Sequence, residues 1–246
     1  MKLKEQIANF FTLMNLVCGV GALLTIADLR TAGLFVLAGA VFDLLDGLVA
    51  RALKITSEIG KQLDSLSDMV TFGVVPGLIA NQLMSGYGVG FVAILIPVFS
   101  AIRLGKFNID ARQSKDFIGL PTPANALFWA SLGIIVFDAD SGSPILSSSY
   151  ESSRMFDLFL NLMHDHRFLV LVVLITSALL VAPFRLMGFK FDNAGWKGNE
   201  LKIILLIISL ILVIILRFMA IPIILLLYIL FSIIHFYILN KHEVQS

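Results

Sequence analysis

The sequence has few charged residues and almost no cysteine. Only 14% of its 246 residues are charged and 58% are apolar, whereas soluble domains average about 25% charged and about 45 to 50% apolar. An ordinary water-soluble globular domain is therefore excluded. The one cysteine, Cys18, lies in an apolar run, which excludes a disulfide framework and a cysteine-based metal site. The net charge of +1 excludes the strongly basic surface that attracts nucleic acid.

Long apolar runs fill most of the chain. A bilayer core needs about 20 mostly apolar helical residues, so we predict an all-α fold: a polytopic transmembrane helical bundle of about eight spans. The chain is expected to form a single integral membrane domain over residues 1–246, with catalytic spans in roughly 9–138 and additional spans in roughly 167–240. The expected spans are roughly 9–27, 32–51, 61–84, 89–106, 121–138, 167–187, 200–216 and 218–240.

The last two spans are separated only by Arg217 and Pro222. One long tilted helix with a re-entrant end is the alternative for this region. Pro76 lies inside the third expected span, where we expect it to kink the helix.

The two ends of the first span carry information on targeting. Residues 1–11 mix charged and apolar side chains, which is typical of a short interfacial helix that leads into the membrane. The apolar run that follows has no small-residue cleavage site before Asp28, so we expect no cleavable signal peptide.

The loops differ in positive charge. Fourteen of the 18 Lys and Arg residues fall in one set of alternate loops. Because Lys and Arg collect on the cytoplasmic side, we expect a protein of the cytoplasmic (inner) membrane with both termini facing the cytoplasm. This orientation requires an even number of spans.

The longest loop on the expected outer side runs from about residue 138 to 166. Its serine-rich first part predicts a polar turn, and the apolar residues after Arg154 predict an amphipathic helix on the outer surface. His164 and His166 could bind a metal, but two histidines in a polar stretch are more often only solvated.

Four aspartates lie at the cytoplasmic ends of the second and third spans. Asp43 and Asp46 share one helical face, and Asp64 and Asp68 share another. The connection between these helices is short, so the helices are antiparallel neighbours whose acidic faces can meet. Two like charges at about 4 Å repel by about 4 kcal/mol at an effective dielectric of 20. Either positive charge is therefore expected there, or some of the acids are protonated.

Divalent cations would supply this charge. Two such ions balance four carboxylates, and oxygen ligands without His or Cys favour Mg²⁺ or Mn²⁺, with Ca²⁺ also possible. Paired metals of this kind are a recurrent device for displacement at phosphorus. Small residues on the same faces, Gly47, Ala50 and Gly60, leave room for a bulky ligand between the helices.

Three other interpretations of the aspartates are open at this point. They could form ion pairs with Arg51, Lys54 and Lys61, or simply lie at the wet membrane interface. They could also serve as a cation or proton relay in an ion-coupled transporter, although no repeated halves with paired broken helices are found. A purely structural membrane scaffold gives no reason to keep four acids in lipid.

The acidic segment has a specific spacing. It reads Asp43-x2-Asp46-Gly47-x2-Ala50-Arg51-x8-Gly60-x3-Asp64-x3-Asp68, which resembles the signature of the CDP-alcohol phosphotransferases at all nine fixed positions. These integral membrane enzymes exchange the CMP of a CDP-activated donor for an alcohol.

Further stretches resemble the membrane-type phosphatidylserine synthase branch of that family. They lie at residues 9–15, 63–76, 103–108 and 117–123, and the resemblance is good through about residue 130. It departs at Ala8, where many relatives have proline. The branch implies transfer of the phosphatidyl group of CDP-diacylglycerol to the hydroxyl of L-serine, giving phosphatidylserine and CMP.

The resemblance also implies roles for individual residues. Asp43, Asp46 and Asp64 would ligate two metals, with Asp68 as a further ligand and the general base. The CDP-diacylglycerol donor would contact Gly47, Ala50, Arg51 and Gly60. Relatives are usually homodimers, which we expect here on resemblance alone.

Other polar residues are candidates on chemical grounds. Thr12 and Asn15 face one side of the first span and either contact the donor nucleotide or join helices. A serine carboxylate or a phosphate needs cations or hydrogen-bond donors; the candidates at the fourth span are Arg103, Lys106, Asn108 and Arg112. The alternative is a sibling phosphatidyltransferase that uses glycerol 3-phosphate or inositol, and this cationic region would discriminate between the acceptors.

Overall fold

Helices make up nearly all of the secondary structure in the described part of the chain. The computed structural model describes residues 3–54, 57–86, 88–109, 117–142, 154–188 and 199–239. Its elements are α1 (Leu3–Leu24), α2 (Leu29–Leu53), α3 (Glu58–Asp68), η1 (Met69–Val74), α4 (Val75–Leu83), η2 (Gly90–Ile94), α5 (Leu95–Ile109), β1 (Phe117–Ile118), α6 (Thr122–Asp140), α8 (Arg154–Met163), α9 (His166–Val181), β2 (Arg185–Leu186), α10 (Glu200–Leu216), η3 (Arg217–Met219), α11 (Ala220–Ile233) and η4 (Ile234–Leu239).

The helices have the length and apolarity of membrane spans. Six helical stretches in the described part of the chain are able to cross a bilayer, and α8 with α9, which are bent by 78° at their junction, make a seventh if the pair is one span. The prediction of an all-α membrane bundle is thus confirmed, with six to seven such stretches. The six are 6–24, 29–53, 58–83, 90–109, 122–140 and 200–236.

The last of these stretches contains a break. Arg217 has φ 47° and ψ −124°, and α10 and α11 pack against each other on its two sides. Leu205 of α10 lies in one core cluster with Leu225 and Tyr228 of α11, although 20 residues of uninterrupted helix would separate Leu205 from Leu225 by about 30 Å. The region is therefore a pair of packed helices, not one long tilted helix.

The beginning of the chain differs from expectation. The interfacial helix predicted for residues 1–11 is not a separate element, because α1 is continuous from Leu3 to Leu24. Its first turns contain no proline or glycine, and Ala8 is a strong helix former. The predicted amphipathic helix after Arg154 is confirmed as α8, whereas the serine-rich residues 143–153 lie outside the described residues.

The third stretch changes its helical type at Pro76. After Asp68 the chain forms the π-helical turn η1, in which the Val75 N–H bonds to the Val70 carbonyl, and α4 then begins with Pro76 in its first turn. Proline has no N–H to donate, and the wider turn accommodates this loss. The kink expected at Pro76 is therefore taken up by a π-helical turn that directly follows Asp68 in the chain.

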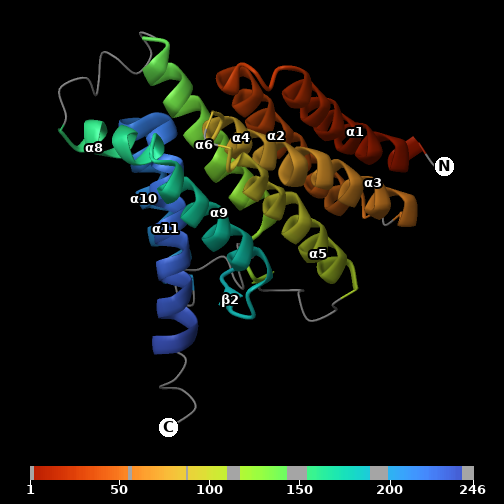
Figure 1. Cartoon of the computed structure of the whole chain (residues 1–246). Coiled ribbons are helices and arrows are strands. Elements are labelled where there is room, and N and C mark those ends of the chain that lie inside the picture. Colours follow the sequence, from red (N-terminus) through yellow and green to blue (C-terminus); the bar gives the residue numbers. More distant parts are fainter. Residues whose placement is uncertain are drawn as a thin grey trace.

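Helices α1 and α2 lie side by side (Figure 1), and both contact η1. A Cβ on Gly39 of α2 would lie 2.7 Å from Thr71 Cγ2 and 3.0 Å from Asn15 Oδ1, so only glycine permits this approach. The Thr71 hydroxyl donates to the Asn15 carbonyl at 3.0 Å. The helices that carry the aspartates are therefore locked together through the first helix.

The starts of α2 and α3 have clear local causes. Asp28 accepts from the N–H groups of Arg30 and Thr31 at the start of α2, and Ser57 accepts from the Gly60 N–H at the start of α3. These are ordinary N-caps. On the other side of the bundle, β1 pairs with β2 in antiparallel fashion and joins the segment before α6 to the segment after α9.

Candidate active site

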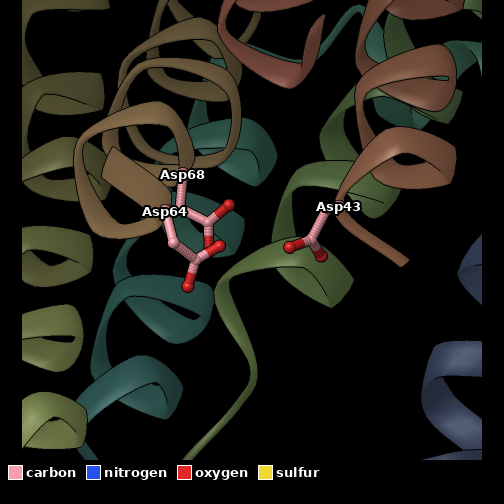
Figure 2. A group of neighbouring side chains, drawn as sticks. All are labelled: Asp43, Asp64 and Asp68. Carbon is pink, nitrogen blue, oxygen red and sulfur yellow. The ribbon is translucent and has the colours of Figure 1, made fainter. Parts of the chain in front are cut away.

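Three of the predicted aspartates converge between α2 and α3. Asp64 and Asp68 project from consecutive turns of α3, and Asp43 faces them from α2 (Figure 2). One carboxylate oxygen from each lies within 4.8 Å of the other two. The helical spacing of the acids and the short connection at residues 54–57 produce this meeting, as the sequence predicted.

The fourth aspartate, Asp46, is held by the first helix. Its Oδ2 accepts a 2.7 Å hydrogen bond from the Thr12 hydroxyl, and both residues are buried. Asp46 also lines a pocket together with Asp64. It therefore lies beside the group of three, with one oxygen committed to Thr12.

Asp68 is the most enclosed of the three clustered acids. Its side chain is buried, and its Oδ1 accepts a 3.0 Å hydrogen bond from Asn15 Nδ2. Thr12 and Asn15 thus each orient one aspartate. Through these bonds they join α1 to α2 and α3, which is one of the two roles that the sequence allowed for them. Contact with the donor stays a prediction for Thr12, which also lines the pocket.

A pocket of about 500 Å³ opens beside the aspartates. The predicted donor-binding residues Gly47, Ala50 and Gly60 line it. The Arg51 guanidinium approaches its rim, since a Cβ on Gly47 would lie 3.4 Å from Arg51 Nη1. The other lining residues are Ala8, Asn9, Thr12, Asp46, Ser57, Glu58, Lys61 and Asp64.

Asn9 is a pocket residue that the sequence analysis did not single out. It is buried, and its Nδ2 donor has no hydrogen-bond partner within the described residues. A Cβ on Gly60 would lie 3.0 Å from its Oδ1. The available signal was its place one turn before Thr12 on the same face of α1.

Arg103 is the cation that the fold places nearest the aspartates from α5. It is buried, donates from Nη1 to the Thr122 hydroxyl at 3.3 Å and lies over the Phe107 ring at 5.8 Å. It lies close enough to Asp68 for the two side chains to interact electrostatically. The other predicted cations do not share this position, because Lys106 is exposed and Arg112 lies outside the described residues.

Asn108 joins helices. Its Nδ2 donates to Ser65 Oγ at 2.8 Å, and its carbonyl accepts from Lys61 Nζ at 2.8 Å. These bonds tie the end of α5 to α3. A role of Asn108 toward serine or phosphate is not visible in this arrangement and stays a prediction.

The ion-pair interpretation of the aspartates finds no support. Within the described residues, no salt bridge joins any of the four to Arg51, Lys54 or Lys61. The charge of the converging carboxylates is thus not balanced by a neighbouring side chain in direct contact. Three carboxylate oxygens within 4.8 Å fit a hard divalent cation such as Mg²⁺ or Mn²⁺.

Comparison with known proteins agrees with this geometry. Residues 5–156 match the family model described as CDP-alcohol phosphatidyltransferase, and these residues include all four aspartates. The chain belongs to the CDP-alcohol phosphatidyltransferase family.

Several relatives within the family carry the same enzyme name. A CDP-diacylglycerol–serine O-phosphatidyltransferase of Helicobacter pylori is 32% identical over 213 residues, covering 83% of this chain and 81% of the relative. Enzymes of the same name from Bacillus subtilis and Methanocaldococcus jannaschii are 38% and 40% identical. The Bacillus match covers 48% of this chain and 70% of the relative, and the Methanocaldococcus match covers 49% and 57%.

Proposed function

We propose that this protein is a CDP-diacylglycerol–serine O-phosphatidyltransferase. It transfers the phosphatidyl group of CDP-diacylglycerol to the hydroxyl of L-serine and releases CMP. The observation that carries this conclusion is the match to the Helicobacter enzyme over 83% of the chain, together with the aspartate cluster at the family signature. The alternative of an ion-coupled transporter leaves both observations without explanation.

The transfer is a displacement at phosphorus. The serine hydroxyl oxygen forms a new bond to the phosphorus that carries the diacylglycerol, and the bond from that phosphorus to the CMP oxygen breaks. CMP leaves with the electron pair, and the hydroxyl proton passes to a base. Asp68 is the base we assign, because a serine hydroxyl needs one in the transition state and Asp68 is buried among the acids.

The chain's own groups prepare this reaction. Asn15 holds the Asp68 carboxylate in one orientation, and Thr12 does the same for Asp46. The nucleotide would lie in the pocket along Gly47, Ala50 and Gly60, where small side chains leave space. Arg51 at the rim can add a forked contact to a phosphate.

The aspartates are the residues that would hold the divalent ions. We assign Asp43, Asp64 and Asp68 to them, with Asp46 as the fourth ligand of a two-ion site. The chemistry supplied by bound Mg²⁺ or Mn²⁺ is neutralisation of the charge that develops on the departing phosphate.

Arg103 is the residue we assign to the serine carboxylate. Its guanidinium is buried, and its Nε has no partner among the described residues. A carboxylate is the natural partner for such a group. Lys106 and Arg112 stay predictions as auxiliary cations.

In the membrane we propose eight spans, with termini and active site facing the cytoplasm. The packing of α10 against α11 supports two separate spans in 200–236, and the distribution of Lys and Arg supports the orientation. Cysteine labelling tests this topology, since Cys18 is buried and gives little background. The cysteine of Arg217→Cys should react with a membrane-impermeant thiol reagent only from the outer side. The cysteine of Lys54→Cys should react with it only from the cytoplasmic side.

The activity test is CMP release by the purified protein in liposomes with CDP-diacylglycerol and Mn²⁺ or Mg²⁺. L-Serine, glycerol 3-phosphate and inositol are offered in parallel, with Asp68→Asn as the variant. Release with serine alone, abolished in the variant, is the expected result. Release only with another alcohol would overturn the serine assignment and keep the family. A homodimer, proposed on family resemblance, is tested by chemical cross-linking in the same liposomes.

A further inference from the structure

A second group of polar side chains is buried between α5 and α6, deeper than the aspartates. Asn125 is 0% exposed, and neither its Oδ1 nor its Nδ2 has a hydrogen-bond partner among the residues that the structure describes. Ser100 is also 0% exposed, and its Oγ has no partner in the described part of the chain. Leaving a buried polar atom unsatisfied costs about 1 to 3 kcal/mol. Three such atoms on two neighbouring helices call for polar partners.

The register of the helices brings these two residues to the same level. Thr122 and Asn125 share a face of α6 one turn apart, as Ser100 and Arg103 do on α5. The hydrogen bond from Arg103 to Thr122 sets the two helices side by side. Because α5 and α6 run in opposite directions, Ser100, one turn before Arg103 on α5, lies opposite Asn125, one turn after Thr122 on α6.

The contacts of α5 and α6 with η1 and α4 independently place Ser100 and Asn125 at the same depth in the bundle. A Cβ on Gly77 would touch Pro97 and a Cβ on Gly73 would touch the Ser100 Cβ at 3.3 Å, so α5 runs opposite to η1 and α4. A Cβ on Gly133 of α6 would touch Ile79 of α4. These contacts place Asn125 at the same depth in the helix bundle as Gly73. Gly73 is about one helical turn beyond Asp68 in the chain.

The chemistry of the group matches an amino acid. The Arg103 guanidinium takes a carboxylate, and the Asn125 Nδ2 is a second donor for it. Asn125 Oδ1 and Ser100 Oγ are acceptors without donors, and an ammonium group brings three donors. Glycerol 3-phosphate and inositol carry no ammonium and would leave Asn125 Oδ1 without a charged donor.

We propose that Asn125 and Ser100 form the subsite for the α-ammonium group of the acceptor and so select an amino acid over other alcohols. This inference rests on the proposed function and deepens it. The acceptor then spans from Asp68, at its hydroxyl, to Arg103 at its carboxylate and Asn125 at its ammonium. Selection arises because a site built to hydrogen-bond a group rejects analogues that lack it.

The test compares two acceptors that differ only in the ammonium group. CMP release is measured with L-serine and with 3-hydroxypropanoate for the wild type, Asn125→Leu and Ser100→Ala. Leucine matches the shape of asparagine, and Asn125→Ala is the second variant if Asn125→Leu does not fold. Ser131→Ala is the matched control, because Ser131 is buried on α6 and its hydroxyl bonds to the Phe128 carbonyl.

We expect Asn125→Leu to raise the KM for serine about tenfold or more, with the KM for CDP-diacylglycerol unchanged. Its kcat/KM for 3-hydroxypropanoate should fall much less than its kcat/KM for serine, because this acceptor loses only the contact of its carboxylate with Asn125 Nδ2. Ser131→Ala should match the wild type with both acceptors. An unchanged KM for serine would overturn the proposal and assign these atoms to buried water. Equal losses with both acceptors would also overturn it. A wild type that releases no CMP with serine would instead refute the proposed function itself.

Discussion

The hydrogen bond from Thr12 to Asp46 offers a direct test of how α1 supports the acids that we propose as metal ligands. It is 2.7 Å long and buried, and bonds to charged groups contribute about 1.5 to 3 kcal/mol. At about 1.4 kcal/mol per factor of ten, the substitution Thr12→Val should weaken Mn²⁺ binding about 10- to 100-fold. Losses of this size are typical when a residue that orients a metal ligand is removed.

Two measurements follow Thr12→Val. One is the Mn²⁺ concentration that gives half-maximal CMP release, and the other is free Mn²⁺ counted by electron paramagnetic resonance, which needs no turnover. Thr12→Ser is the control, since it keeps the hydroxyl and loses only the methyl group. The reasoning is refuted if valine binds Mn²⁺ as tightly as threonine, or if serine loses as much affinity as valine.

Three further predictions concern other parts of the chain. Gly60→Ala should raise the KM for CDP-diacylglycerol in the CMP assay, because the new Cβ lies 3.0 Å from Asn9 Oδ1 in the pocket. Gly105→Ala is the control and should leave this KM unchanged, because no described atom outside the neighbouring helix backbone lies within 4 Å of its Cβ. Asp28→Ala should lower stability by about 1 kcal/mol in thermal unfolding through loss of the α2 cap. The Thr31 hydroxyl lowers the pKa of Asp28, so this difference between wild type and variant should persist at neutral pH and vanish as the pH falls through the lowered pKa. EDTA should abolish CMP release, and added Mn²⁺ or Mg²⁺ should restore it; full activity in EDTA would contradict a metal site.

The spans were predictable because apolar length is a strong signal. The expected span 200–216 coincides with α10, and the expected span 121–138 differs from α6 by one or two residues at each end. The separate interfacial helix was wrong, since mixed polarity in residues 1–11 does not by itself interrupt a helix. The π-turn η1 was not predictable in type, because Pro76 indicates a disturbance without indicating how the chain absorbs it.

The aspartates were predictable for a different reason. Their spacing places Asp64 and Asp68 on consecutive turns of one helix, and the short connection leaves Asp43 on a facing helix, so meeting follows from geometry alone. What the spacing does not fix is the rotation of one helix about its axis relative to the other. Asp46 shares a face with Asp43 on α2, yet one of its oxygens is taken by Thr12.

The role of α1 follows from that rotation. Thr12 bonds to an aspartate of α2, while Asn15, one turn further, bonds to an aspartate of α3. One face of a single helix therefore holds acids from two others, and Gly39 lets the three approach closely. Repulsion between the carboxylates would rotate α2 and α3 apart, and these two bonds act against that rotation. The sequence left open whether Thr12 and Asn15 contact the donor or join helices, because both roles need polar residues on the same face. In the packing of α1 each of them holds one acid through a hydrogen bond, and contact of Thr12 with the donor stays a prediction.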